Sequence, residues 1–249
     1  MSNSQLTEPY WLTTYDLSPS KVTKFLISVI ALLVAFNLLE RAIVYWLNTQ
    51  GQGEFISIYF NFDREANLPS LYSALALGFS GYLLNTIAAV KRRIRGKYLR
   101  HWQALSYIFF FLAIDEACSI HELLIPVMKQ VVRAEGLLYF PWVIPAFILV
   151  IIFLFAFHKF IFSLPNQTKT LFILAGGIYV FGALGMEVVG GYIADNYGYS
   201  TIYGIVSSIE ELLEMFGVVI FINALLNYLQ FQTPKLGFRF LFNSQKPKS

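Results

Sequence analysis

Residues 137–157 read LLYFPWVIPAFILVIIFLFAF, a run without a single charged side chain. A helix that crosses a bilayer needs about 20 consecutive apolar residues, because the hydrocarbon core is about 30 Å thick. This stretch therefore predicts a transmembrane helix.

Similar apolar runs, each bounded by charge, Pro or Gly, cover most of the chain. They predict further spans at 25–47, 69–90, 104–128, 171–194 and 202–229, which brings the total to six. The composition agrees, because 57% of the residues are hydrophobic and 13% are charged, whereas a soluble domain is about 25% charged. We expect an all-α, polytopic transmembrane helix bundle at 25–229, between an N-terminal segment (1–24) and a basic tail (230–249).

Three further features narrow the class of protein. Residues 1–20 are polar and include Glu8 and Asp16, unlike a cleavable signal peptide, so we expect the first span to be retained. Cys118 is the only cysteine, which excludes an intrachain disulfide. The formal net charge of +3 is too small to indicate nucleic-acid binding.

The distribution of basic residues predicts the orientation. Cytoplasmic loops of membrane proteins carry an excess of Lys and Arg. The loop between the second and third spans holds Lys91, Arg92, Arg93, Arg95, Lys97 and Arg100. With this loop inside, the inner segments hold fourteen of the eighteen Lys and Arg residues, and both termini are cytoplasmic. Aromatic residues near the outer ends of the spans, Trp142 among them, are interpreted as anchors at headgroup depth.

Eight of the fifteen acidic residues fall inside the predicted spans, where charge is costly. They are Glu40, Asp115, Glu116, Glu122, Glu187, Glu210, Glu211 and Glu214, and Arg41 is the only permanent cation among them. A charge at the centre of a span costs about 2.5 to 3.5 kcal/mol even on lenient insertion scales, so such residues normally face the bundle interior and mark a function. The acids cannot all be paired with one arginine. Some must therefore be protonated, bind a cation or contact water.

The depth of these residues groups them. Glu40 and Arg41 lie in the outer half of the first span, and Asp115 lies near the middle of the third. Glu187 lies in the last third of the fifth span, and the acids of the sixth lie in its first half on one face, because successive helical residues turn by about 100°. We predict one cluster in the outer half of the membrane, made of Glu40, Arg41, Asp115, Glu116, His121, Glu122, Glu187, Glu210, Glu211 and Glu214.

Two kinds of ligand suit such a cluster. Carboxylate oxygens bind divalent cations such as Ca²⁺, Mg²⁺ or Mn²⁺, and His121 would also admit iron or zinc. The candidate metal ligands are Asp115, His121, Glu122, Glu187, Glu211 and Glu214. Alternatively, crowded carboxyl groups share protons and form a relay.

Three functions follow from these chemistries. The first is cation binding or proton exchange, as in a small transporter. The second is a metal-dependent membrane enzyme, a hydrolase of lipids or amphipathic substrates with Asp115, Glu122 or Glu214 as general base. No His-Glu-x-x-His or Gly-x-Ser-x-Gly spacing accompanies them. The third is a structural or assembly subunit whose carboxyl groups are satisfied by internal hydrogen bonds.

Four short segments carry a resemblance to known sequences. They are FNFDREANLP at 60–69, IDE at 114–116, IHE at 120–122, and IEE at 209–211 followed by Glu214. Together they resemble a group of uncharacterised bacterial polytopic membrane proteins, over residues 40–228. The resemblance implies a bacterial inner membrane and brings no activity with it. In the first segment, Glu65 and Asn67 either reach the outer mouth of the cluster or cap the helix before Pro69.

The orientation can be tested with reporter fusions. A reporter that is active only in the cytoplasm, fused after Ser249, is expected to be active, because the tail and the 91–100 loop are both basic. A periplasmic reporter at the same position should be silent. Periplasmic activity there would contradict the orientation.

Overall fold

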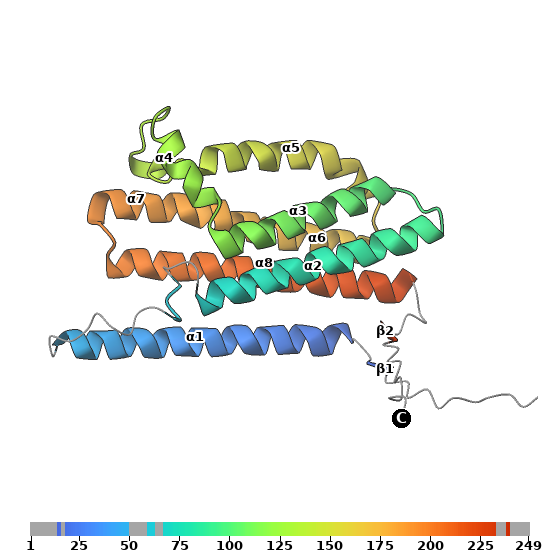
Figure 1. The fold of residues 1–249 in the computed structure, drawn as a ribbon, viewed down its shortest axis with the longest axis horizontal. Coiled ribbons are helices and arrows are strands. Elements are labelled where there is room, and N and C mark those ends of the chain that lie inside the picture. The colour runs from blue at the N-terminus through green and yellow to red at the C-terminus, as the bar shows by residue number, and fades with distance from the viewer. Residues whose placement is uncertain (1–13, 16–17, 50–58, 63–66, 233–237, 240–249) are drawn as a thin grey trace, which may run out of the picture.

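The structure, a computed structural model, describes residues 14–15, 18–49, 59–62, 67–232 and 238–239, and almost all of them are helical (Figure 1). The longer helices are α1 (Pro19–Thr49), α2 (Leu68–Arg93), α3 (Leu99–Cys118), α5 (Val143–Phe162), α6 (Asn166–Val180), α7 (Glu187–Tyr197) and α8 (Thr201–Gln232). Shorter pieces are the 3₁₀ turns η1 (His121–Leu123) and η2 (Gly136–Leu138), helix α4 (Leu124–Met128) and the π-helix η3 (Phe181–Met186). A two-residue antiparallel ladder pairs β1 (Thr14–Tyr15) with β2 (Phe238–Arg239).

Five described helical segments are long and apolar enough to cross a membrane: Pro19–Ile43, Leu68–Arg93, Val143–Phe162, Asn166–Tyr197 and Thr201–Gln232. The fourth of these consists of α6, η3 and α7 in succession. Helix α3 is not among the five, since it carries Arg100 and His101 near its start and Asp115 and Glu116 near its end. It nevertheless runs antiparallel to α2 along the bundle (Figure 1).

The predicted third span, 104–128, is wrong as a single helix. Helix α3 ends at Cys118, and Ser119 adopts a left-handed conformation with φ 52°. The Asp115 carbonyl accepts the backbone N–H groups of Ser119 and Ile120, and the Asp115 carboxylate accepts that of His121. Such side-chain and C-cap bonds compete with continuation of a helix. Asp115 and Glu116 therefore lie in the last turn of α3, not near the middle of a span.

The predicted fourth span, 137–157, is displaced toward the C-terminus. Helix α5 begins at Val143, and residues 136–138 form the separate turn η2. Proline has no N–H to donate and is tolerated in the first turn of a helix, which suits Pro141 just before α5 and Pro145 in its first turn.

Helix α8 is the centre of the bundle and contacts α1, α2, α6, η3 and α7. Its C-terminal half is dry: Ile222, Leu225 and Ala224 are fully buried, in one core with Trp102 of α3. Helices in lipid associate mainly through close packing, and small residues make this possible. Gly217 shows the effect, because a Cβ there would lie 2.9 Å from the Cβ and the backbone N of Tyr179 on α6.

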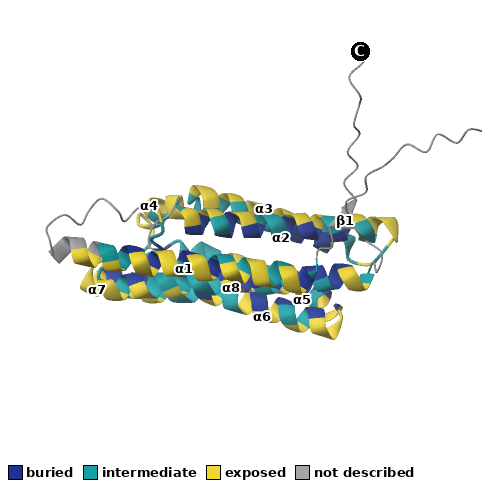
Figure 2. Ribbon diagram, turned by 90° about the horizontal axis from the view of Figure 1, so that it is seen from below, coloured by how far each residue is buried: buried dark blue, intermediate teal, exposed yellow. Residues whose placement is uncertain are grey.

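Helix α1 is peripheral and is held by polar contacts. Figure 2, which looks onto α1, shows mostly exposed residues along it. Asn223 Nδ2 donates to Thr23 Oγ1 at 2.8 Å, and the Tyr72 hydroxyl donates to the Leu26 carbonyl at 3.2 Å. In lipid such interhelical bonds contribute on average about 0.6 kcal/mol each, so α1 depends on several of them.

The basic residues of the described chain gather mainly at one end of the bundle. The start of α1, the turn between α2 and α3, and the turn between α5 and α6 all lie at that end (Figure 1). There Lys91 Nζ donates to Gln232 Oε1 of α8 at 3.2 Å and lies 5.3 Å from the centre of the Tyr228 ring. The basic tail beyond Gln232 lies outside the described residues, apart from Phe238–Arg239.

The close approach of α6 and α8 can be tested at Gly217. We expect Gly217→Ala to lower the free energy of unfolding by about 1 to 3 kcal/mol, since the added methyl group meets the Tyr179 backbone. Gly177→Ala is the matched control, because a Cβ there has no neighbour within 4 Å. Unfolding in mixed detergent micelles measures both. Equal stability of the two variants would contradict the packing.

Candidate functional site

The ionisable side chains gather at the other end of α8, away from the dry core. The η3 and α7 segments contact α8 there, and the end of α3, the turn η1 and the start of α5 lie toward the same end of the bundle (Figure 1). The contacts of individual side chains define this site.

The side chains of Asp115 and His121 are in hydrogen-bond contact across the break that ends α3. Asp115 Oδ2 lies 3.0 Å from His121 Nδ1, and Asp115 Oδ1 accepts the His121 backbone N–H at 2.8 Å. The His121 ring also packs on the Trp142 indole, with ring centroids 4.6 Å apart. These contacts fix the orientation of the imidazole. An imidazole paired with a carboxylate can accept and return a proton.

Glu187 and Glu210 place two carboxyl groups in hydrogen-bond contact. Glu187 is the first residue of α7, and its side chain bonds to that of Glu210 on α8. Trp142 Nε1 donates to Glu187 Oε1 at 2.7 Å. Two carboxyl groups bond to each other only when one is protonated, because an ionised carboxylate is an acceptor alone and two of them repel. We therefore expect this pair to share a proton.

The π-helix η3 brings this pair together. Its hydrogen bonds run from i to i+5, so each turn is wider than an α-turn, and π-segments are frequent at functional sites. Gly182 packs against α8, where a Cβ would lie 3.1 Å from both the Glu210 carbonyl oxygen and Glu214 Cγ. Farther along, Gly190 packs against Tyr203. Gly182 and Gly190, on either side of Glu187 in the sequence, thus both lie at a helix contact.

Glu214 lies at the centre of the acidic residues. It interacts electrostatically with five of the predicted cluster residues: Glu116, His121, Glu187, Glu210 and Glu211. Glu122, which is exposed, interacts with Glu187. Electrostatic interactions or hydrogen bonds link eight of the predicted residues: Asp115, Glu116, His121, Glu122, Glu187, Glu210, Glu211 and Glu214.

Glu40 and Arg41 have a different set of contacts. Arg41 Nη2 donates to the Gly204 carbonyl at 3.1 Å and to Ser208 Oγ at 3.2 Å. Glu40 Oε2 accepts the Phe60 backbone N–H at 3.0 Å. Arg41 thus fastens α1 to the start of α8, and Glu40 fastens α1 to the segment 59–62.

The first loop supports the capping alternative for Asn67. Asn67 is the N-cap of α2, and its Oδ1 accepts the Ser70 backbone N–H at 3.0 Å. Its Nδ2 donates to the Asn61 carbonyl. Glu65 lies outside the described residues.

Two site residues were missed by reasoning from the sequence. Trp142 was interpreted as an interfacial anchor, but its indole N–H binds Glu187. Tyr179 lines a cavity beside the site, and its only signal in the sequence is a phenol within the apolar run at 171–194. A helical wheel does not distinguish either from an ordinary packing residue.

The proposed metal ligands do not form a coordination site. Within the parts of the chain that the structure describes, no group of three or more His, Cys, Asp or Glu side chains is arranged so that it could hold a metal ion. The prediction of a divalent cation on Asp115, His121, Glu122, Glu187, Glu211 and Glu214 therefore finds no support here. The physical reason is that key donors have other partners: Asp115 binds His121, and Glu187 binds Trp142.

The apolar helices and the acidic site are those of a membrane protein. The chain belongs to the family described as Domain of unknown function (DUF8692), which matches residues 25–229. No curated protein and no solved structure matches the chain. The family agrees with the resemblance drawn from the sequence, and it assigns no activity.

The shared proton can be tested by infrared spectroscopy. The purified protein at neutral pH is expected to show the C=O stretch of a protonated carboxyl group, and Glu210→Gln should remove intensity from it, because the pair then no longer needs a proton. Glu135→Gln is the control, since Glu135 is exposed and paired with Arg133 at 2.7 Å. A spectrum without that band in the unsubstituted protein would exclude the shared proton.

Proposed function

We propose that this chain is a small multi-pass transporter of the bacterial inner membrane that exchanges protons at its acidic site. The observation that carries the proposal is the carboxyl–carboxyl contact between Glu187 and Glu210. A contact of this kind binds one proton in place of two negative charges, and it breaks when that proton leaves. Proton loss is thereby linked to the contact between α7 and α8.

The topology is part of the same proposal. Six spans with cytoplasmic termini account for the basic residues at one end of the bundle, and α3, antiparallel to α2, is the sixth span (Figure 1). Its polar end is tolerated in the membrane because Asp115 is paired with His121 and faces the protein. The site then lies in the outer half of the membrane.

Several groups can share the protons of the site. Glu214 interacts with His121 and with Glu187, so it lies between the imidazole pair and the carboxyl pair. Toward the basic end, Trp102, Leu225 and Ile222 are buried in an apolar core. This arrangement supports a transporter whose inner side is shut and whose proton site is near the outer side.

Glu214→Gln tests the proposal, because Gln keeps the shape of the side chain and cannot ionise. Raising the pH removes protons from the site, and the repulsion between the resulting carboxylates exists only in the folded protein. The melting temperature should therefore fall as the pH rises. Glu214→Gln is expected to make the free energy of unfolding less dependent on pH, by up to about 1.4 kcal/mol per pH unit, which is the slope for one proton.

Melting curves of both proteins, across pH and with or without divalent cations, give the measurement. Glu135→Gln, at an exposed ion pair, should behave like the unsubstituted protein. An identical pH response in Glu214→Gln and the unsubstituted protein would remove Glu214 from the proposal. Stabilisation by divalent cations with no response to pH would favour a cation site over proton exchange.

A further inference from the structure

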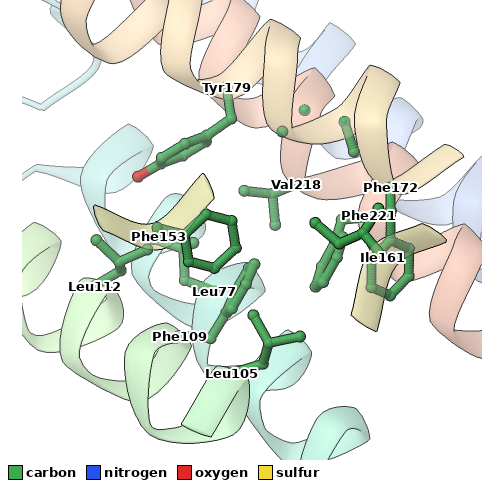
Figure 3. A pocket seen from close by; sticks show the side chains of 13 residues that line it. Leu77, Leu105, Phe109, Leu112, Phe153, Ile161, Phe172, Tyr179, Val218 and Phe221 are labelled. Atoms are coloured by element: carbon green, nitrogen blue, oxygen red, sulfur yellow. The ribbon is translucent and has the colours of Figure 1, made fainter. Parts of the chain in front are cut away.

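A cavity of about 100 Å³ lies between α2, α3, α5, α6 and α8 (Figure 3). Its walls are apolar or aromatic, and Leu112, Phe153 and Phe221 are among them. Gly176 and Gly217 also line it. Helix α5 closes one side with Phe153 and Ile161, and it contacts α6, η3 and the aromatic rings at the start of α3. The cavity thus suits an apolar group.

Tyr179 relates the cavity to the acidic residues. Tyr179 lines the cavity, and Figure 3 shows its hydroxyl pointing away from the Phe172 and Phe221 rings. Four carboxyl groups interact electrostatically with the Tyr179 side chain: Asp115, Glu116, Glu211 and Glu214.

The helical spacing also relates the cavity to the acidic residues. Leu112 is one turn before Glu116 on α3, and Val218 is one turn after Glu214 on α8. Side chains four residues apart on a helix are neighbours on one face. An apolar group in the cavity therefore has carboxyl groups directly beyond its end.

We infer that the cavity and the acidic site together bind a small organic cation with an apolar body, such as a short-chain alkylammonium ion. The inference rests on the proposed proton exchange and names its substrate class. The apolar chain lies in the cavity, and the ammonium group lies beside Glu214 and Glu116. Binding displaces a proton from the site to solution, so the charge of the site is conserved.

The charge of the acidic site and the size of the cavity both favour small organic cations with an apolar body. A carboxyl-rich site adjoining an apolar cavity favours a cation over a neutral or anionic molecule of the same shape. An apolar cavity of about 150 Å³ admits benzene, so this smaller cavity suits a chain of on the order of four carbons. n-Butylammonium is therefore the probe, with n-butanol and n-butyrate as the neutral and anionic counterparts.

Calorimetry of the purified full chain in detergent, in two buffers with different heats of ionisation, measures affinity and proton release together. We expect n-butylammonium to bind at least about tenfold more tightly than n-butanol, with release of one proton, and n-butyrate not to bind. Glu214→Gln should weaken n-butylammonium binding and abolish the proton release.

Two neighbouring glycines provide a matched pair of variants. Gly176 lines the cavity and Gly177 does not, and a Cβ at either position has no neighbour within 4 Å. Gly176→Leu should fill the cavity and weaken binding at least about tenfold, whereas Gly177→Leu should leave binding unchanged. Melting temperatures show that both variants fold.

The outcomes separate this inference from the proposed function. Equal binding of n-butanol, or equal binding by Gly176→Leu and Gly177→Leu, would overturn the organic cation in this cavity. Absence of binding with the pH response of the melting temperature retained would overturn it and leave proton exchange standing. Binding without proton release would contradict proton exchange itself.

Discussion

Carboxyl groups cannot face hydrocarbon, and this constraint organises the molecule around α8. The first half of α8 carries Glu210, Glu211 and Glu214, so other helices must cover it with polar partners. The second half carries Ile222 and Leu225 and packs in a dry core. One helix thus carries both the acidic residues and much of the buried apolar core.

The same constraint shapes the backbone near the site. Helix α3 stops at Cys118 because Asp115 turns back to bind His121, and the helix from Asn166 to Tyr197 widens into a π-helix just before Glu187. Irregular backbone at membrane depth is tolerated where it is buried in protein or lines a polar cavity. Both irregularities in the described chain occur beside the acidic residues, as this rule requires.

Much of this architecture could be predicted from the sequence. The long apolar runs predict five helices that the structure also has, with shifted ends. Local breaks could not be predicted, because the end of α3 depends on a hydrogen bond between the Asp115 side chain and the His121 backbone.

The partners of single groups were also beyond the sequence. Trp142 contacts Glu187 across 45 positions of the chain. The helical periodicity of one segment gives the face on which a residue lies, but it does not identify what another segment brings to that face. For the same reason the apolar cavity beside Tyr179 could not be predicted, since its walls come from several helices.

In the π-helix η3, the number of residues matters as much as their chemistry, because it sets the direction in which Glu187 points. Its 6 residues, Phe181–Met186, hold one residue more per turn than an α-helix would, so α7 is out of phase with α6. Losing any one of these residues would close the turn to an ordinary α-helix and rotate α7 by about 100°. Glu187 would then turn away from Glu210 although every ionisable group of the site was still present. The number of residues between Val180 and Glu187 is therefore a part of the site that no residue-by-residue comparison of side chains would reveal.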